Sequence, residues 1–377
     1  MGIYLDHAAT TFPDPKVLQA VSRCCQQGLG NASAQHRAGV QAAMVVEHAR
    51  QVIAGSIHAD SQELYFFSGG TEVNNAVMKG IAGARRKYGR HIIVSAIEHP
   101  SILEPARWLE KQGFRVSYVP VDRQGRVDPD DIRRSMTKKT ILVSVMQANN
   151  EIGTVQPVKA IGQLCRQQGV YFHTDASQSF TKIPIDVRRD YLDLVTLSSH
   201  KVHGPKGVGA LYMRQGIQID PLMHGGSHEH GIRAGTYNTE GIAGFGKAVE
   251  ISDRRDIVRM RRLRDYFIRQ VEMHVPGARL NGSRQARVCN NVNFSFEGLT
   301  GKGLFSVLNK KNIFVATGSA CASNELKVSH VLQALGIGQE RANGAVRMTL
   351  SKWTTKKEID AVVKAIRSSV NKIRVQA

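Results

Sequence analysis

From about residue 60 to about residue 215, short runs rich in β-branched and other apolar residues alternate with stretches of helical periodicity. Several runs are almost entirely apolar, which is typical of strands in a sheet that helices cover on both faces. Alternation over this length predicts an α/β fold with a mostly parallel, doubly wound sheet. We expect the seven strands of this sheet at residues 64–67, 91–97, 115–121, 140–146, 171–175, 194–198 and 209–213.

A basic stretch at residues 253–274 follows the sheet and has apolar residues at helical spacing. The remaining sequence predicts strands at residues 290–296, 313–316 and 345–350 and a last helix from residue 355. No internal repeat, low-complexity tract or Pro/Ser-rich linker interrupts the chain. We therefore expect a large domain formed by residues 15–252, packed tightly against a smaller α/β domain formed by residues 1–14 and 253–377.

No apolar run approaches the ~18 residues that span a bilayer. The first residues combine neither a basic region nor a long apolar stretch, so they do not resemble a signal peptide. These features predict a cytoplasmic protein with no membrane association.

The charge is strongly positive, because 51 lysines and arginines outnumber 31 acidic residues to give a net charge of +20. Such a surface attracts polyanions, and the arginines of the stretch 253–274 and the cluster Arg85-Arg86-Lys87 contribute to it. The alternative is a well-solvated surface with no nucleic-acid role.

The five cysteines show no pattern of a disulfide framework or a zinc site, and we expect no metal. A lone cysteine is usually a small buried hydrophobic residue. Cys24 and Cys165 lie in helical patterns and fit that description. Cys321 differs, because small and polar residues surround it on both sides and predict a mobile loop.

Two candidate site residues lie at or just after the ends of predicted strands. Lys201 comes just after the strand 194–198 and precedes a turn rich in glycine and proline, so it can project into a cleft. Burial lowers the pKa of a lysine and makes its amine usable in Schiff-base chemistry. Asp175 ends the strand 171–175, where a carboxylate could keep a pyridine nitrogen protonated. The alternative for Asp175 is a cap of the next helix.

A glycine turn, Ser68-Gly69-Gly70-Thr71-Glu72, joins the strand 64–67 to a predicted helix. Backbone N–H groups at Gly70, the Thr71 hydroxyl and the helix dipole can bind a phosphate there. Each signal is weak alone. A phosphate cradle, a strand-end aspartate and a turn lysine in this chain order together predict a site for pyridoxal 5′-phosphate (PLP).

The sequence resembles the cysteine desulfurases of the nitrogen-fixation and iron–sulfur-cluster type, which belong to the class V aminotransferases with PLP fold type I. The resemblance covers nearly the whole chain, with its motifs in family order. The matching stretches begin at Tyr4, Ser68, Glu98, Asn149, Thr174, His200, Gly231 and Gly318.

The resemblance implies roles for individual residues. Lys201 would bind PLP covalently and move the Cα proton, and His99 would stack on the ring and assist proton transfer at the substrate thiol. Asn150 and Arg347 would bind the substrate carboxylate, for which the planar guanidinium fork is suited. The other implied cofactor contacts are Asp175 to the pyridine nitrogen, Gln178 to the phenolic oxygen, and Gly70, Thr71, Ser198 and His200 to the phosphate, with Asn150 also beside the cofactor. Thr236 would reach the phosphate of the neighbouring subunit, which implies a homodimer.

The same resemblance implies that Cys321 attacks the sulfur of L-cysteine, so that L-alanine leaves and a persulfide remains for an acceptor protein. The eight residues that follow Cys321, up to Ser329, resemble the subfamily with the longer loop. The sequence ends at Ala377, directly after the last predicted helix, and we expect no C-terminal extension for an iron–sulfur scaffold.

The pathway stays open between sulfur supply for DNA phosphorothioation, tRNA thiolation and iron–sulfur clusters. We place DNA phosphorothioation slightly ahead because of the basic surface. A selenocysteine lyase and a class V aminotransferase would share the fold. A catalytically silent nucleic-acid-binding or scaffold subunit is the alternative from another class.

Overall fold

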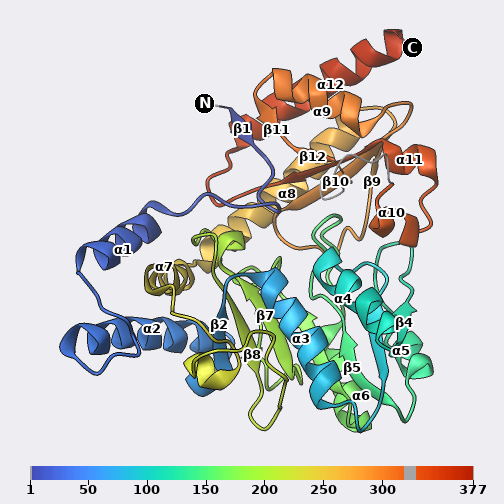
Figure 1. Cartoon of the computed structure of the whole chain (residues 1–377). Helices are drawn as coiled ribbons and strands as arrows, with labels where there is room; N and C mark the ends of the chain where they lie inside the picture. The colour runs from blue at the N-terminus through green and yellow to red at the C-terminus, as the bar shows by residue number, and fades with distance from the viewer. Residues whose placement is uncertain (1, 318–327, 377) are drawn as a thin grey trace.

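The structure is a computed structural model that describes residues 2–317 and 328–376 (Figure 1). Cys321 and the segment around it lie outside the described residues. Among the helices of the described part, none is long and apolar enough to cross a membrane.

The predicted seven-stranded sheet is present, with strands in the order β2-β8-β7-β6-β5-β3-β4. β8 pairs antiparallel with β2 and β7, and the other neighbours pair parallel. The strands are β2 (Leu64–Phe67), β3 (His91–Ser95), β4 (Arg115–Val119), β5 (Thr140–Ser144), β6 (Tyr171–Asp175), β7 (Leu194–Ser198) and β8 (Gly209–Met213).

Three of these strands end two residues before their predicted ends, at Ser95, Val119 and Ser144. Ile97 and Met146, the predicted ends of β3 and β5, are buried although they lie beyond the paired residues. Their apolar character therefore reflects burial under the chain that follows and not strand pairing.

Helices cover both faces of this sheet, as the apolar strands predicted. On one face lie α3 (Gly70–Ala84) and α4 (Pro100–Lys111), and on the other lie α2 (Arg37–Gly55), α6 (Val158–Gln168) and α7 (Thr239–Glu250). Alternate residues of β3 separate accordingly, because Ile92 and Val94 join the first core and Ile93 joins the second. The helices α1 (Pro15–Gln26) and α5 (Pro129–Ser135) complete this part of the chain.

A second, smaller sheet has the order β12-β13-β10-β9, with every neighbouring pair antiparallel. The predicted strand 313–316 is two short strands in different sheets, because β11 pairs with β1 while β12 joins β13. The bounds are β1 (Ile3–Tyr4), β9 (Ala278–Leu280), β10 (Asn291–Phe296), β11 (Ile313–Phe314), β12 (Ala316–Thr317) and β13 (Ala345–Thr349).

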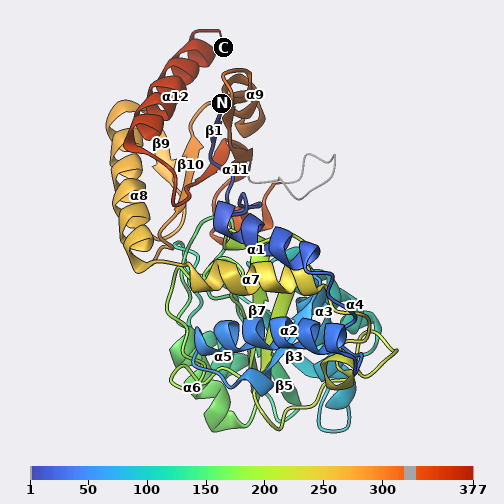
Figure 2. The ribbon, with the colours of Figure 1, turned by 90° about the vertical axis from the view of Figure 1, so that its left-hand side faces the viewer.

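Two long helices, α8 (Arg254–His274) and α12 (Lys356–Gln376), lie side by side against this smaller sheet (Figure 2). They share an apolar core with β10 and β13, and Leu5 from the N-terminus joins the same core. Shorter helices complete the region: α9 (Gly301–Lys310), α10 (His330–Ala334) and α11 (Gln339–Asn343). We keep the domain boundaries 15–252 and 1–14 with 253–377 as a proposal, which this separate core supports.

The residues after β1 connect the two sheets, and we call residues 5–14 the N-terminal segment. At one end, the Leu5 carbonyl accepts a hydrogen bond from the Thr349 N–H at 2.7 Å. At the other end, the N–H groups of Thr11 and Asp14 donate to the carbonyls of His200 and His203 at 2.9 and 3.0 Å. The N-terminal segment therefore crosses the carboxyl ends of β6 and β7, where ligands of such sheets bind.

Candidate active site

Asp175 lies at the carboxyl end of β6 and is only 6% exposed. Its Oδ1 accepts a hydrogen bond from the Ser177 N–H, and its Oδ2 accepts one from the Asn74 side-chain amide, both at 2.8 Å. These donors orient the carboxylate and compensate for its burial. The sequence interpretation missed Asn74, although its position one turn into the helix after the glycine turn could have indicated it.

Lys201 lies in a short 3-10 turn (η2, Ser199–Lys201) directly after β7. Its Nζ donates to the carbonyls of Ala8 and Ala9 at 2.5 and 2.7 Å, so the amine points at the N-terminal segment. The Gln178 side-chain amide donates to the same Ala8 carbonyl at 3.0 Å. The structure thus brings together Lys201 and Gln178, two of the predicted cofactor residues, and adds a backbone contact that sequence motifs alone could not indicate.

His99 caps the N-terminus of α4 with its Nδ1, which accepts the Ser101 N–H at 3.1 Å and lies 2.8 Å from the Ser101 hydroxyl. Burial lowers the pKa of His99, and the positive charges of Lys201, His330 and Arg347 act in the same direction. The nearby Asp175 acts in the opposite direction on this pKa. His99 therefore lies within electrostatic reach of Asp175, Lys201 and Arg347.

The predicted phosphate site lies at the N-terminus of α3, a helix of 15 residues. A Cβ atom added at Gly70 would lie 3.1 Å from the Ser177 hydroxyl and 3.7 Å from the Ser198 Cβ, so the absence of a side chain keeps this space open. Thr71 lies in the first turn with its residue exposed. A helix N-terminus with open backbone N–H groups favours an anion.

His200 lies in the same turn as Lys201, with its Nδ1 3.1 Å from the Thr10 hydroxyl. Burial, assisted by the charges of Lys201 and Lys206, lowers the pKa of His200 to about 4. Thr236 is exposed, and none of the contacts above includes it. Thr236 is predicted to contact the phosphate bound by a second subunit, and this contact stays a prediction.

Arg347 on β13 comes from the smaller sheet and is 6% exposed. Its Nη2 donates to Asp6 at 2.7 Å, and its Nη1 donates to the backbone carbonyl of Asn150 at 3.0 Å. Its Nε is buried and has no hydrogen-bond partner among the described residues. A buried guanidinium with an unused N–H group suits a carboxylate ligand.

Two buried carboxyl groups that the sequence interpretation did not assign lie beside these residues. Burial raises the pKa of Glu98 to about 8, and one of its oxygens has no partner within the described chain. Burial also raises the pKa of Glu151 to about 7, and its side chain accepts the Ser329 hydroxyl at 2.5 Å. Glu98 directly precedes His99, and Glu151 directly follows Asn150. The motifs that carry the family resemblance therefore already contained both residues.

The helix α10 begins close after the segment that contains Cys321, and two contacts attach its start to the active site. Ser329, its N-cap, is bonded to Glu151, and the His330 Nε2 donates to the Glu98 carbonyl at 2.9 Å. The chain leaving the Cys321 segment is therefore fixed next to His99 and Asn150.

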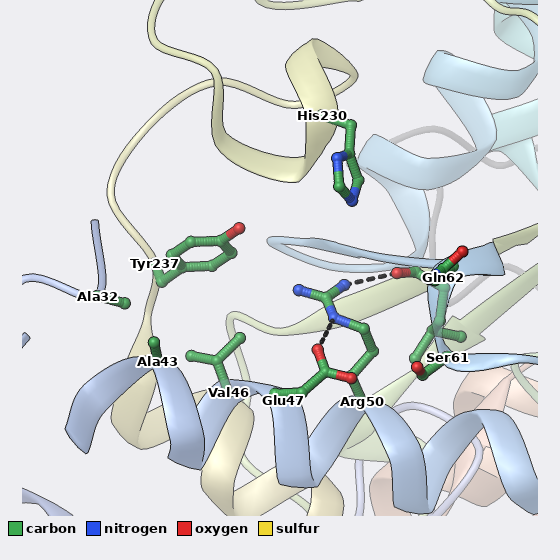
Figure 3. A pocket seen from close by; sticks show the side chains of 10 residues that line it. Ala32, Ala43, Val46, Glu47, Arg50, Ser61, Gln62, His230 and Tyr237 are labelled. Carbon is green, nitrogen blue, oxygen red and sulfur yellow. Dashed lines mark hydrogen bonds and ion pairs between the residues drawn. The ribbon is translucent and has the colours of Figure 1, made fainter. Parts of the chain in front are cut away.

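A separate pocket of about 300 Å³ opens between α2 and residues on both sides of Thr236 in the sequence. Arg50, Gln62, His230 and Tyr237 are among the residues that line it (Figure 3). Arg50 forms an ion pair with the buried Glu229 at 2.8 Å. None of the predicted site residues lines this pocket. Its ion pair instead fixes the turn η3 (His228–Gly231) that leads to Thr236.

The residues at the carboxyl edge fit PLP in their chemistry. They offer an amine, a buried carboxylate for a ring nitrogen and a glycine-lined helix N-terminus for a phosphate. Arg347 of β13 adds an N–H group that has no partner among the described residues. Within residues 2–317 and 328–376, no group of three or more His, Cys, Asp or Glu side chains is arranged to hold a metal ion.

Comparisons with known proteins agree with this chemistry. The family model described as aminotransferase class-V matches residues 3–362. A cysteine desulfurase IscS from Dictyoglomus turgidum is 45% identical over 375 residues, which are 99% of this chain and 95% of the relative.

Two solved structures share the fold. A NifS-like protein has a TM-score of 0.92 and 34% identity, over 98% of this chain and all of its own. DndA from Streptomyces lividans has a TM-score of 0.78 and 32% identity, over 92% of this chain and 99% of its own. The chain therefore belongs to the aminotransferase class-V family, among the PLP-dependent cysteine desulfurases of the IscS and NifS-like type.

Proposed function

We propose that this desulfurase converts L-cysteine to L-alanine at the carboxyl edge of the large sheet, leaves a persulfide on Cys321, and passes the sulfur to an acceptor protein. One observation supports this most strongly. Lys201 and Gln178 from the larger sheet meet the N-terminal segment at Ala8, and Arg347 from the smaller sheet meets the same segment at Asp6. An amine for the cofactor and a guanidinium for the substrate carboxylate thus face one site.

PLP, when bound, withdraws electrons from the Cα atom of an amino-acid substrate. Lys201 would hold the cofactor covalently and then move the Cα proton. Asp175 would hold the ring nitrogen, oriented by Asn74, while Gln178 would contact the phenolic oxygen. The phosphate would be held by Gly70, Thr71, Ser198 and His200.

The substrate would be oriented by its carboxylate, which Arg347 can receive at its unused Nε. The Asn150 carbonyl already holds one arm of this arginine, at 3.0 Å from Nη1. Sulfur transfer then needs the Cys321 thiolate to form an S–S bond to the substrate sulfur. The C–S bond breaks with its electron pair going to carbon, and protonation of that carbon gives alanine.

The direct experiment is incubation of the purified protein with L-cysteine, followed by alanine quantification and intact-protein mass spectrometry. We expect stoichiometric alanine and a mass gain of one sulfur that maps to Cys321. Cys321→Ser should abolish both, whereas Cys25→Ser, at an exposed cysteine of α1, should change neither. Alanine production that persists in Cys321→Ser would contradict the proposal and favour an aminotransferase-like or lyase activity.

We propose a homodimer in which Thr236 of each chain contacts the phosphate held by its partner. The exposure of Thr236 and the fixed turn before it support this arrangement. Sedimentation should give a dimer, and Thr236→Val should weaken PLP binding in that dimer without dissociating it. A monomeric enzyme that is fully loaded with PLP would contradict the proposed contact between subunits.

The pathway remains a proposal as well. The IscS relatives favour sulfur supply of the iron–sulfur-cluster type, and no comparison supports DNA phosphorothioation specifically. The basic helix α8 nevertheless exposes a set of arginines that suits nucleic-acid phosphates: Arg254, Arg255, Arg259, Arg261, Arg262 and Arg269. Arg264, which the sequence interpretation counted in this surface, is buried and bonded to Asp265 and to the carbonyls of Arg287 and Val288.

Binding of the whole enzyme to labelled duplex DNA and to tRNA at several salt concentrations tests the α8 surface. If it binds phosphates, Arg259→Glu with Arg262→Glu should weaken binding at least tenfold and flatten the salt dependence. The control pair Arg133→Glu with Arg134→Glu, exposed arginines of α5, should not. Equal effects of both pairs of substitutions, or no binding of nucleic acid, would contradict a phosphate-binding role of α8. The positive charge would then serve solubility only.

A further inference from the structure

A chain of hydrogen bonds links buried polar side chains of β5, β6 and β7 to Asn74 of α3 and Ser101 of α4, all on one face of the sheet, and ends at His99. It runs from Ser144 to His173 (2.8 Å), Thr196 (2.9 Å), Asn74 (2.7 Å) and Ser101 (2.8 Å). The first four are fully buried, and Ser101 is 7% exposed. From Asn74 a branch reaches Asp175. Buried networks of this kind persist when every member is satisfied.

Asp175 fixes the direction of these hydrogen bonds, because a carboxylate oxygen can only accept. The Asn74 amide nitrogen therefore faces Asp175 and, with its second hydrogen, the Ser101 hydroxyl oxygen at 2.8 Å. The Asn74 oxygen in turn accepts the Thr196 hydroxyl at 2.7 Å. Since Thr196 has given its only hydrogen to Asn74, its oxygen accepts from the His173 Nε2.

The same logic reaches His99. The Ser101 oxygen accepts from Asn74, so the Ser101 hydroxyl hydrogen is available for the His99 Nδ1 at 2.8 Å. The Ser101 backbone N–H also donates to Nδ1, at 3.1 Å, as the cap of α4. Nδ1 can accept from these two donors only through its lone pair, so it carries no proton. A neutral imidazole then has its proton on Nε2.

We infer that Asn74 and Ser101 are positioning residues that hold His99 in the Nε2–H tautomer, so that His99 faces the reacting groups as a hydrogen-bond donor. This inference rests on the proposed active site and deepens it. In this tautomer Nε2 already carries a proton, so His99 has to donate that proton before Nε2 can accept another. The proton of the substrate thiol must therefore go first to another acceptor.

The tautomer is measurable in the PLP-loaded enzyme labelled with ¹⁵N-histidine, with His99 assigned by its disappearance in His99→Gln. We expect the Nδ1 resonance in the unprotonated range and the Nε2 resonance in the protonated range at neutral pH. A protonated Nδ1 in the resting enzyme would overturn the inference. Absorbance of bound PLP and alanine production on the same sample separate this outcome from failure of the proposed function.

A matched pair of variants tests the positioning role. Asn74→Leu removes all hydrogen bonds of this amide at similar size, and we expect mixed tautomers at His99 and about tenfold weaker PLP binding. Asn281→Leu is the control, because Asn281 is 1% exposed and also donates to two side chains, but in the smaller sheet. It should lower stability without moving the His99 resonances.

Should Asn74→Leu fail to fold, Ser101→Ala supplies the second variant. It removes one of the two donors at Nδ1 and keeps the backbone N–H, so the Nδ1 resonance should shift partway toward the mixed-tautomer position. An unchanged Nδ1 resonance in Ser101→Ala, or in a folded Asn74→Leu, would show that the network does not set the tautomer.

Discussion

Two polar clusters of the active site differ in how completely their hydrogen-bonding groups are satisfied, one around Asp175 and one around Arg347. On the cofactor side, formed by the strand ends of the large sheet, Asn74 has partners for both its oxygen and its nitrogen, and Asp175 has a donor at each oxygen. On the substrate side, where the smaller sheet meets the large one, the Arg347 Nε and one Glu98 oxygen have no partner in the described chain.

The difference teaches that the two sides have different tasks. A resident cofactor is held in a fixed orientation, which requires a rigid support such as the hydrogen-bonded Asn74 and Asp175 pair. A substrate that enters and leaves has to supply partners of its own, so its side of the site keeps open donors. Buried polar groups without partners are uncommon, and each one suggests a ligand or a proton held for a reason.

The largest expected effect comes from removing the open donor on the substrate side. Arg347→Gln should lower kcat/KM for L-cysteine about 100-fold, mainly through KM, because the carboxylate loses its charged partner. The absorbance of bound PLP should remain. Arg264→Gln, at a buried arginine of α8, is the control. A loss of PLP in Arg347→Gln would show that the two sides are not separable.

Removing the carboxylate that pairs with Arg347 should affect stability instead. Asp6→Ala leaves a buried guanidinium without its ion-pair partner and should lower the free energy of unfolding by about 3 kcal/mol. Added L-alanine should raise the melting temperature of this variant more than that of the parent enzyme, because a ligand carboxylate at Arg347 supplies the negative charge that Asp6 no longer provides. An equal increase in both proteins would show that the ligand carboxylate does not compensate for the loss of Asp6.

The buried carboxyl group of Glu98 predicts how the free energy of unfolding depends on pH. Its pKa in the folded protein is about 8, above the usual value of 4.5, so the folded state holds this proton more tightly than the unfolded state. The free energy of unfolding should therefore decrease as pH rises from about 5 to about 8. Glu98→Gln should remove part of that decrease, measured by denaturant unfolding at pH 6 and pH 8.5. A parallel decrease in both proteins would assign the pH dependence to other groups.

The smallest effect is expected where α10 is attached to the site. Ser329→Ala removes both the cap of α10 and the bond to Glu151, and should cost about 1 kcal/mol of unfolding free energy. Thr300→Ala removes the cap of α9, which has no such bond to Glu151, and should cost a similar amount. Only Ser329→Ala should also slow alanine production. Equal activities would show that this attachment serves folding alone.

Much of the fold followed from the sequence because strand and helix periodicities report burial directly. The bounds of β2, β6, β7 and β8 agree with the prediction. The prediction was wrong where apolar residues are buried without pairing, at the ends of β3 and β5, and where residues 313–316 divide between two sheets. Pairing depends on neighbours that are distant in the sequence, so local pattern cannot specify it.

The sequence by itself determined which chemical groups are present and in what order: an amine after one strand, a carboxylate at the end of another, a glycine turn, and an arginine far along the chain. Tertiary structure alone decided that the carbonyls of Ala8 and Ala9 meet Lys201, that Asp6 pairs with Arg347, and that Asn74 joins Asp175 to Ser101. These contacts span from 27 to 341 residues of sequence, and neither a backbone carbonyl nor the direction of a buried amide leaves a mark in residue spacing.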